Sequence, residues 1–435
     1  MSILIENTCI LPLTGCDSTI ENGYLIIEDN LIKEMGRGSA PPAEYLRVID
    51  GKQKVVMPGF INTHTHAAMT LMRGYADDLP LMEWLEQKIW PLEARLTGED
   101  VYWGTMLAIL EMIKSGTTTF NDMYFFMEDT ARAVEQTGIR AVLSRGLVGV
   151  GPSAEAGLEE SRELAQRWHR TREERITVML GPHAPYTCPP DYLHKVIALA
   201  RELGLGIHTH ISETKGEAED IKKQYGKTSA ALMEEVGLFD LPAIAAHCVH
   251  LSQTDISILK RCGIGVAHNP ESNMKLASGI APVPELLEAG IAVGLGTDGA
   301  SSNNNLDMLQ EMRTCSLLHK VNSMNPTVLP AYQALEMATV NGARALGLDN
   351  EIGSLQPGLK ADLILLDLNS AHMRPVHDVV ANIVYSAQAG DVHTVIINGQ
   401  IVMENRKILT FDEDQVLEQA EKTAVKLASA HNSSN

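Results

Sequence analysis

Eight short apolar runs, separated by stretches with helical spacing, constrain this chain more strongly than any other feature of its sequence. Runs such as ITVMLGPHA and IAVGLGTDG are continuously apolar, which indicates strands buried on both faces. The intervening stretches, such as PDYLHKVIALARELG, repeat apolar residues at helical intervals. Eight such units predict a (β/α)8 TIM barrel. The predicted strands lie within residues 55–66, 117–122, 140–147, 176–184, 205–213, 243–250, 264–270 and 291–299.

The two ends of the chain differ in pattern from the middle. Residues 1–57 contain short strand-like segments separated by Gly, Asn and Asp, which favours a β-meander over βαβ units. ADLILLDL and HTVIINGQIVMENRKIL repeat this pattern near the other end, and the second contains an Asn-Gly hairpin signal. We therefore predict a small β-sandwich domain formed from both termini, by residues 1–57 and 355–435, with a helix at 412–431. The barrel domain would occupy residues 58–354.

Net charge and cysteine usage exclude several classes of protein. The formal net charge of −20 at pH 7 repels phosphate backbones and anionic lipids, so we expect no nucleic-acid partner and no membrane partner. The six cysteines include no Cys-x-x-Cys pair, which argues against a disulfide framework and a thiolate zinc site. The first residues carry no basic leader, and no apolar run reaches the ~18 residues of a membrane span. These features predict a cytoplasmic protein.

His64 and His66 stand at the end of the first apolar run. Side chains alternate between the two faces of a strand, so residues two apart point to the same side and both imidazoles can enter one cavity. Metal binding is one interpretation of this pair. Two exposed or hydrogen-bonded histidines at a strand end are the alternative.

Three other runs end in similar residues, namely His210 with Glu213, His247, and Asp298. In a barrel the carboxyl ends of all strands face one mouth, where active sites are built. Three imidazoles and one carboxylate suit Zn²⁺, Fe²⁺ or Mn²⁺. Each residue taken singly has another interpretation. His210 could be a hydrogen-bonded core histidine, Asp298 could be a turn residue, and Glu213 could be an acidic residue favoured at the start of a helix. Four strand ends sharing one mouth favour a metal site.

The motifs PGFINTHTH, HTHISE, AHCVH and GTDGASSNN occur in the order and spacing of the amidohydrolase superfamily. The chain resembles most the branch of 5-methylthioadenosine/S-adenosylhomocysteine deaminases, with guanine deaminases and triazine hydrolases as relatives. The resemblance extends to IGSLQPGLKADLILLD near the end, which in this family returns the chain to the β-sandwich.

This resemblance implies that His64, His66, His210 and Asp298 bind one divalent metal ion, zinc in the first place, with iron and manganese left open. Binuclear relatives use a carboxylated lysine on the fourth strand, and ITVMLGPHAPYTC contains no lysine, so a mononuclear site is expected.

The resemblance also assigns the chemistry. Asp298 would act as general base, Glu213 would protonate a ring nitrogen, and His247 would steer the attacking oxygen. The expected reaction is hydrolytic deamination at C6 of 5'-methylthioadenosine, S-adenosylhomocysteine or adenosine, giving the inosine analogue and ammonia. One alternative is an enzyme that hydrolyses guanine or a triazine. The other is a protein that keeps the barrel but has lost its catalytic activity.

The resemblance to these deaminases also implies which residues contact the nucleoside. Glu93, in a WPLE segment, would bind the ribose hydroxyls, and Arg145 and His183 would face the ligand. The loop GLVGVGPSAEAGLEES contains no basic residue to meet the carboxylate of S-adenosylhomocysteine, which favours methylthioadenosine or adenosine.

Residues 67–116, with three tryptophans, form a long connection expected to supply an insert or lid. The family suggests a homodimer or homotetramer.

Overall fold

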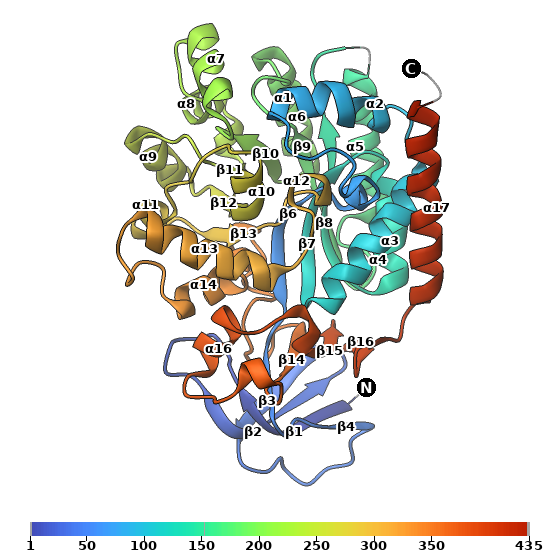
Figure 1. Ribbon diagram of the computed structural model, residues 1–435, viewed down its shortest axis with the longest axis vertical. Helices are drawn as coiled ribbons and strands as arrows, with labels where there is room; N and C mark the ends of the chain where they lie inside the picture. Colours follow the sequence, from blue (N-terminus) through green and yellow to red (C-terminus); the bar gives the residue numbers. More distant parts are fainter. Residues whose placement is uncertain (1, 152, 433–435) are drawn as a thin grey trace.

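A computed structural model describes residues 2–151 and 153–432 of the chain. Eight parallel strands form one sheet in which each strand pairs with the next in sequence (Figure 1). All eight predicted strands are present, and the predicted TIM barrel is confirmed. The strands are β6 (Phe60–Thr65), β7 (Thr117–Tyr124), β8 (Arg140–Leu147), β9 (Ile176–Pro182), β10 (Ile207–Ile211), β11 (Ala243–His247), β12 (Gly265–His268) and β13 (Val293–Leu295).

Helices follow the strands and cover the outside of the barrel (Figure 1). Two of them begin with capping boxes, in which Thr97 pairs with Asp100 and Ser252 with Asp255, so the first backbone N–H groups find partners. The barrel helices are α3 (Gly98–Lys114), α4 (Met127–Thr137), α5 (Ala154–Trp168), α6 (Pro190–Leu203), α7 (Lys215–Tyr225), α8 (Ser229–Glu235), η3 (Leu238–Asp240), α9 (Gln253–Cys262), α10 (Pro270–Lys275), α11 (Val283–Glu288), α12 (Ala300–Asn303), α13 (Met308–Asn322), α14 (Ala331–Met337) and α15 (Val340–Ala345).

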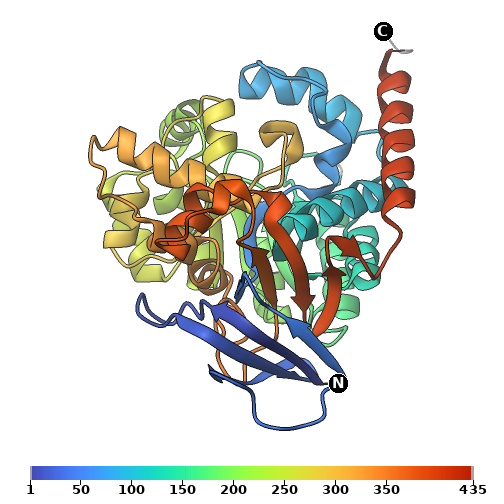
Figure 2. The ribbon, with the colours of Figure 1, turned by 60° about the horizontal axis from the view of Figure 1, so that its bottom comes forward.

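The two termini together form the second domain, a continuous nine-stranded mixed sheet. Figures 1 and 2 show its amino-terminal strands in blue beside its carboxyl-terminal strands in orange and red, at one end of the barrel. The predicted assembly from both ends is confirmed. Its strands are β1 (Ser2–Ile10), β2 (Ile20–Glu28), β3 (Leu31–Arg37), β4 (Arg47–Asp50), β5 (Lys54–Pro58), β14 (Leu363–Asp367), β15 (Val392–Ile397), β16 (Gln400–Glu404) and β17 (Lys407–Ile408).

The β-meander expected for residues 1–57 is only half right. β1, β2 and β3 are antiparallel neighbours, as a meander requires. β4 and β5 instead run parallel to β1, where β4 pairs with residues 3–6 and β5 with residues 9–10. Both short strands use the edge of β1 that β2 leaves free, and this pairing depends on tertiary contacts that local turn signals do not report.

The remaining helices are not among those that alternate with the barrel strands. η1 (Ala67–Met72), α1 (Leu81–Trp84), η2 (Leu85–Ile89) and α2 (Trp90–Glu93) occupy the long connection after β6, at the end of the barrel away from the nine-stranded sheet (Figure 1). The predicted final helix is α17 (Glu413–Asn432), which packs along α3. Three short helices connect β14 to β15, namely η4 (Ala371–Met373), α16 (Val379–Tyr385) and η5 (Ala389–Asp391).

No helix within residues 2–151 and 153–432 has the length and apolar character needed to span a membrane.

A buried ion pair joins the two domains. Arg140 begins β8, and Asp362 directly precedes β14. Their side chains are 3% and 2% exposed, and two guanidinium nitrogens donate to the two carboxylate oxygens at 2.7 and 3.2 Å. Such a bidentate pair fixes orientation as well as distance. It therefore sets how the nine-stranded sheet meets the amino-terminal end of the barrel.

We expect the substitution Asp362→Asn to lower the free energy of unfolding by about 3–5 kcal/mol, because it leaves a buried guanidinium without its counter-charge. Chemical denaturation with circular dichroism would measure the change. Glu202→Gln is the matched control, since Glu202 pairs with Arg162 on the surface with its side chain 56% exposed, and this variant should unfold like the wild type. Equal stability of both variants would show that the buried pair does not hold the domains together.

Candidate metal centre and active site

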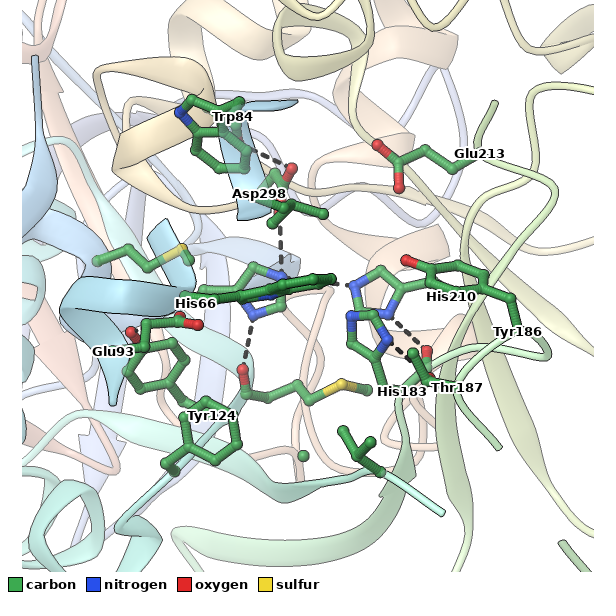
Figure 3. Close-up of a pocket in the computed structure, with 18 of the residues that line it drawn as sticks. His66, Trp84, Glu93, Tyr124, His183, Tyr186, Thr187, His210, Glu213 and Asp298 are labelled. Atoms are coloured by element: carbon green, nitrogen blue, oxygen red, sulfur yellow. Dashed lines mark hydrogen bonds and ion pairs between the residues drawn. The ribbon is translucent and has the colours of Figure 1, made fainter. Parts of the chain in front are cut away.

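Polar residues at or just beyond the ends of several barrel strands meet in one cavity of about 610 Å³. This volume is in the range of pockets that hold small organic ligands. The cavity opens at the carboxyl ends of the strands, where TIM barrels carry their active sites. Figure 3 shows its labelled residues converging on the space around His66. The predicted site residues that line it are His66, Glu93, Arg145, His183, His210, Glu213, His247 and Asp298.

Three imidazoles present their Nε2 atoms to a common point. Nδ1 of His66 donates to the carbonyl oxygen of Met123 at 2.6 Å, and Nδ1 of His210 donates to that of His183 at 2.7 Å. A carbonyl only accepts, so both rings carry their proton on Nδ1 and keep a lone pair on Nε2. Nδ1 of His64 lies 2.8 Å from Nε2 of His208, which leaves Nε2 of His64 facing the same space.

The carboxylate of Asp298 completes this cluster. Its Oδ1 lies 3.3 Å from Nε2 of His64 and 3.3 Å from Nε2 of His66. Its Oδ2 accepts hydrogen bonds from the hydroxyls of Ser272, at 2.6 Å, and Ser302, at 2.9 Å. Burial by itself raises the pKa of Asp298, but the neighbouring histidines outweigh it and hold that pKa well below its usual range. One carboxylate oxygen is therefore fixed by serines, and the other is free to bind a cation.

These donors fit a divalent metal ion. Nε2 of His66 and Nε2 of His210 are 3.4 Å apart, and metal–nitrogen bonds of 2.0–2.1 Å in a tetrahedron place ligand atoms about 3.3 Å apart. Burial lowers the pKa of His64 to about 3, so its imidazole is neutral, as a ligand must be. Its Nε2 is buried without a hydrogen-bond partner among the described residues. Lone pairs that converge in this way repel one another unless a cation lies between them.

Glu213 and His247 lie beside the cluster. Nε2 of His247 is 3.9 Å from Oε2 of Glu213, and Nδ1 of His247 donates to Oδ1 of Asn273 at 2.9 Å. Burial raises the pKa of the Glu213 carboxyl, although the nearby His247 opposes the shift. The backbone N–H of Glu213 donates to the carboxylate of Glu217 at 2.8 Å, which fixes the loop. Glu213 is thus a carboxyl group that retains its proton to a higher pH than usual.

The three residues expected to contact a nucleoside all reach the cavity. Glu93 accepts a hydrogen bond from the hydroxyl of Tyr124 at 2.8 Å, and Figure 3 shows this pair across His66 from His183. Nδ1 of His183 lies 3.0 Å from the hydroxyl oxygen of Thr187. Arg145 also lines the cavity, but its side chain is already paired: Nε of Arg145 donates to the carboxylate of Glu160 at 2.6 Å.

The long connection after β6 covers part of the cavity mouth. Trp84 and Trp90 from this segment line the cavity, together with Glu93. The indole N–H of Trp84 donates to the carbonyl oxygen of Ala76 at 3.0 Å, so its ring is held in place. Trp90 keeps 40% of its surface exposed. The segment therefore forms one wall of the pocket, as expected for an insert or lid.

Two site residues adopt a backbone conformation that is uncommon for side chains other than glycine. His247 has φ of 69° and Asp298 has φ of 60°, both in the left-handed region. Strain of this kind costs about 1–3 kcal/mol and collects at functional sites. Both residues lie where a barrel strand ends or has just ended, and the left-handed turn makes their side chains part of the cavity wall.

Several residues that support the site were not given roles from the sequence. His208 orients His64, Ser272 and Ser302 hold Asp298, and Asn273 holds His247. Ser302 stands within the motif GTDGASSNN, and Ser272 and Asn273 follow the seventh apolar run. Their position just beyond strand ends was a signal that they face the mouth. Three of these four partners could not be predicted, because their hydrogen bonds join segments that follow different strands. The bond between Ser302 and Asp298 lies within one segment.

A family model described as the amidohydrolase family matches residues 55–402. This chain belongs to the amidohydrolase family. The 5-methylthioadenosine/S-adenosylhomocysteine deaminase of Syntrophomonas wolfei is 66% identical over 98% of this chain and 99% of its own length. The resemblance found in the sequence is thereby confirmed.

Two solved structures share the architecture. An adenosine deaminase from Xanthomonas campestris with bound zinc superposes with a TM-score of 0.93 at 34% identity, over 98% of both chains. An atrazine chlorohydrolase from Arthrobacter aurescens TC1 complexed with zinc has a TM-score of 0.91 at 24% identity, over 97% of this chain and 100% of its own. The second likeness is one of fold alone.

We expect the His66→Ala variant to bind one metal ion fewer per chain than the wild type, because it removes one of the converging Nε2 donors. Elemental analysis of purified, dialysed protein would measure the difference. His372→Ala is the control, since the His372 ring hydrogen-bonds Asp391 at 2.7 Å outside the barrel and should not affect metal content. Unchanged metal content in His66→Ala would contradict the assignment of the cluster.

Proposed function

We propose that this amidohydrolase removes the C6 amino group of 5'-methylthioadenosine, S-adenosylhomocysteine or adenosine, giving the inosine analogue and ammonia. The observation that carries this proposal is the buried carboxyl of Glu213 beside His247, at the edge of the cluster of imidazoles. Attack on a heteroaromatic ring needs a proton donor for the adjacent ring nitrogen, whereas hydrolysis of a simple amide does not. The names of relatives such as the Syntrophomonas wolfei deaminase support this choice of substrate.

His64, His66, His210 and Asp298 would hold the metal ion, for which we propose zinc. When bound, the ion lowers the pKa of a water molecule so that hydroxide is available near neutral pH. The zinc named with the adenosine deaminase of Xanthomonas campestris supports this identity. Asp298 remains ionised because the surrounding histidines lower its pKa, so its carboxylate can accept the proton that the water gives up.

Glu213 and His247 complete the reaction. The carboxyl of Glu213 donates its proton to N1 of the purine as the oxygen of water adds to C6. Nε2 of His247 hydrogen-bonds the attacking oxygen, and its ring is fixed for this by Asn273. Asp298 returns its proton to the amino group, which leaves as ammonia. C6 gains its carbonyl as the remaining hydroxyl proton passes to the carboxylate of Glu213, which restores the proton donor. Burial raises the pKa of Glu213 and so favours its protonated form, since desolvation disfavours the carboxylate.

Glu93 would accept hydrogen bonds from the ribose hydroxyls, with Tyr124 holding its carboxylate in place. Among the described residues that line the cavity, Arg145 is the one lysine or arginine, and it already pairs with Glu160. The neighbouring wall is formed by Val148 and Val150, which suit a thioether better than a carboxylate. We therefore propose 5'-methylthioadenosine as the preferred substrate. A homodimer or homotetramer in the cytoplasm remains a prediction from the sequence.

A turnover panel separates the proposed function from its alternatives. Ammonia release would be followed with methylthioadenosine, S-adenosylhomocysteine, adenosine, guanine and an aminated triazine, and chloride release would be followed with a chlorinated triazine. We expect turnover of the three adenine nucleosides, with the highest kcat/KM for methylthioadenosine. Turnover of guanine or of the triazine alone would overturn the assignment, and the panel would then identify the alternative enzyme.

We expect Glu213→Gln to lower kcat by about 10²- to 10⁴-fold, which is the usual contribution of a general acid, while the metal content stays unchanged. Steady-state kinetics with elemental analysis would measure both quantities. Glu219→Gln, on the exposed side of α7 with its side chain 68% exposed, is the matched control and should retain full activity. Full activity of Glu213→Gln would remove the proton donor from the proposed mechanism.

Glu93→Gln tests the ribose contact separately. We expect kcat/KM for methylthioadenosine to fall by about 10- to 100-fold, since a hydrogen bond to a charged group contributes about 1.5–3 kcal/mol. The fall should be much smaller with a 2',3'-dideoxyadenosine substrate, which lacks the 2' and 3' hydroxyls that Glu93 would bind. An equal fall with both substrates would show that Glu93 does not bind the ribose.

A further inference from the structure

A second group of metal-binding side chains lies outside the active-site cavity. His268 is the last residue of β12, and Cys315 and His319 stand one helical turn apart on α13. Residues four apart on a helix share a face, so both α13 side chains can meet the strand end. All three residues are at least 99% buried. None of them lines the active-site cavity, so the proposed function does not use them.

The donor atoms of these residues have the spacing of metal ligands. Nε2 of His268 and Nε2 of His319 are 3.3 Å apart, which equals the ~3.3 Å expected between nitrogen ligands of tetrahedral zinc. One donor atom from each of the three residues lies within 4.8 Å of the other two. The active-site cluster has nearly the same spacing, with 3.4 Å between Nε2 of His66 and Nε2 of His210.

A simple hydrogen bond between the two Nε2 atoms accounts for the distance between the histidines, but it gives no reason for a thiol to lie beside them. Nδ1 of both rings is buried without a partner among the described residues. This holds whether the Nε2 atoms share a proton or bind a metal ion, so the Nδ1 atoms do not distinguish the two interpretations. Buried polar groups usually gather where something binds them.

We propose that His268, Cys315 and His319 bind a second divalent cation of the zinc type, which has a structural role. Two imidazoles and a thiolate are ligands that zinc prefers, and one water molecule would complete a tetrahedron. Cys315 gives up its thiol proton to solvent when the ion binds. The ion joins the end of β12 to α13.

The surroundings are compatible with this assignment. Burial lowers the pKa of His268 well below its usual range and that of His319 to about 4, so both imidazoles are neutral and keep a lone pair for a metal. Burial raises the pKa of the Cys315 thiol, and a bound cation reverses that shift by stabilising the thiolate. The ion would therefore be taken up before or during folding, because the closed site offers no open path.

Cobalt substitution tests this site without measuring turnover. Protein refolded with Co²⁺ should show a near-ultraviolet sulfur-to-cobalt charge-transfer band, because the active-site cluster contains only nitrogen and oxygen ligands. The band should persist in His66→Ala and disappear in Cys315→Ser. Cys262→Ser, a half-buried cysteine at the end of α9, is the matched control and should retain the band.

Zinc analysis provides the second measurement. We expect two zinc ions per wild-type chain, one in Cys315→Ser and one in His66→Ala. If Cys315→Ser does not fold, the cobalt band of His66→Ala still decides the question. No charge-transfer band and a single zinc ion in the wild type would overturn the second site. Deaminase activity would be unaffected by that outcome, so the failure of this proposal is distinct from failure of the proposed function.

Discussion

The contact between the first and last barrel strands, β6 and β13, holds the active site together. The sheet order ends at these two strands, and side chains connect them: the amide of Asn62 donates to the hydroxyl of Thr297 at 2.8 Å. The backbone N–H of Asp298 donates to the carbonyl oxygen of His64 at 3.0 Å. A Cβ on Gly296 would lie 2.8 Å from the backbone nitrogen of His64, so only glycine permits this approach. The same contacts that close the barrel therefore also place Asp298 beside the histidines.

A layer of polar side chains behind Asp298 extends this contact to α13. Ser302 holds one oxygen of Asp298, and the amide of the next residue, Asn303, donates to the carbonyl oxygen of Thr297 at 2.7 Å. The same amide hydrogen-bonds Glu311 in the first half of α13. The second cation proposed between β12 and α13 would therefore stabilise the helix that supports the active-site carboxylate.

Local sequence patterns predicted the barrel because each strand is buried on both faces and each helix has one apolar side. They predicted less of the small domain, since β4 and β5 pair in parallel with β1 and no local turn signal encodes that choice. Within the site, spacing showed that His64 and His66 point the same way. It did not show that Nδ1 of His66 bonds the carbonyl oxygen of Met123, which fixes the ring and directs its lone pair.

The sequence by itself determined the fold, the family and the chemical types that stand at the strand ends, because strand periodicity and burial are encoded in neighbouring residues. Only the tertiary structure decided which of these residues meet. Ser272 on α10 and Ser302 on α12 both hold Asp298, and Arg145 is already paired with Glu160. Cysteine spacing argued against a thiolate zinc site, whereas the fold places Cys315 beside His268, 47 residues earlier. Contacts across such separations depend on how strands and helices pack, which no short stretch of sequence records.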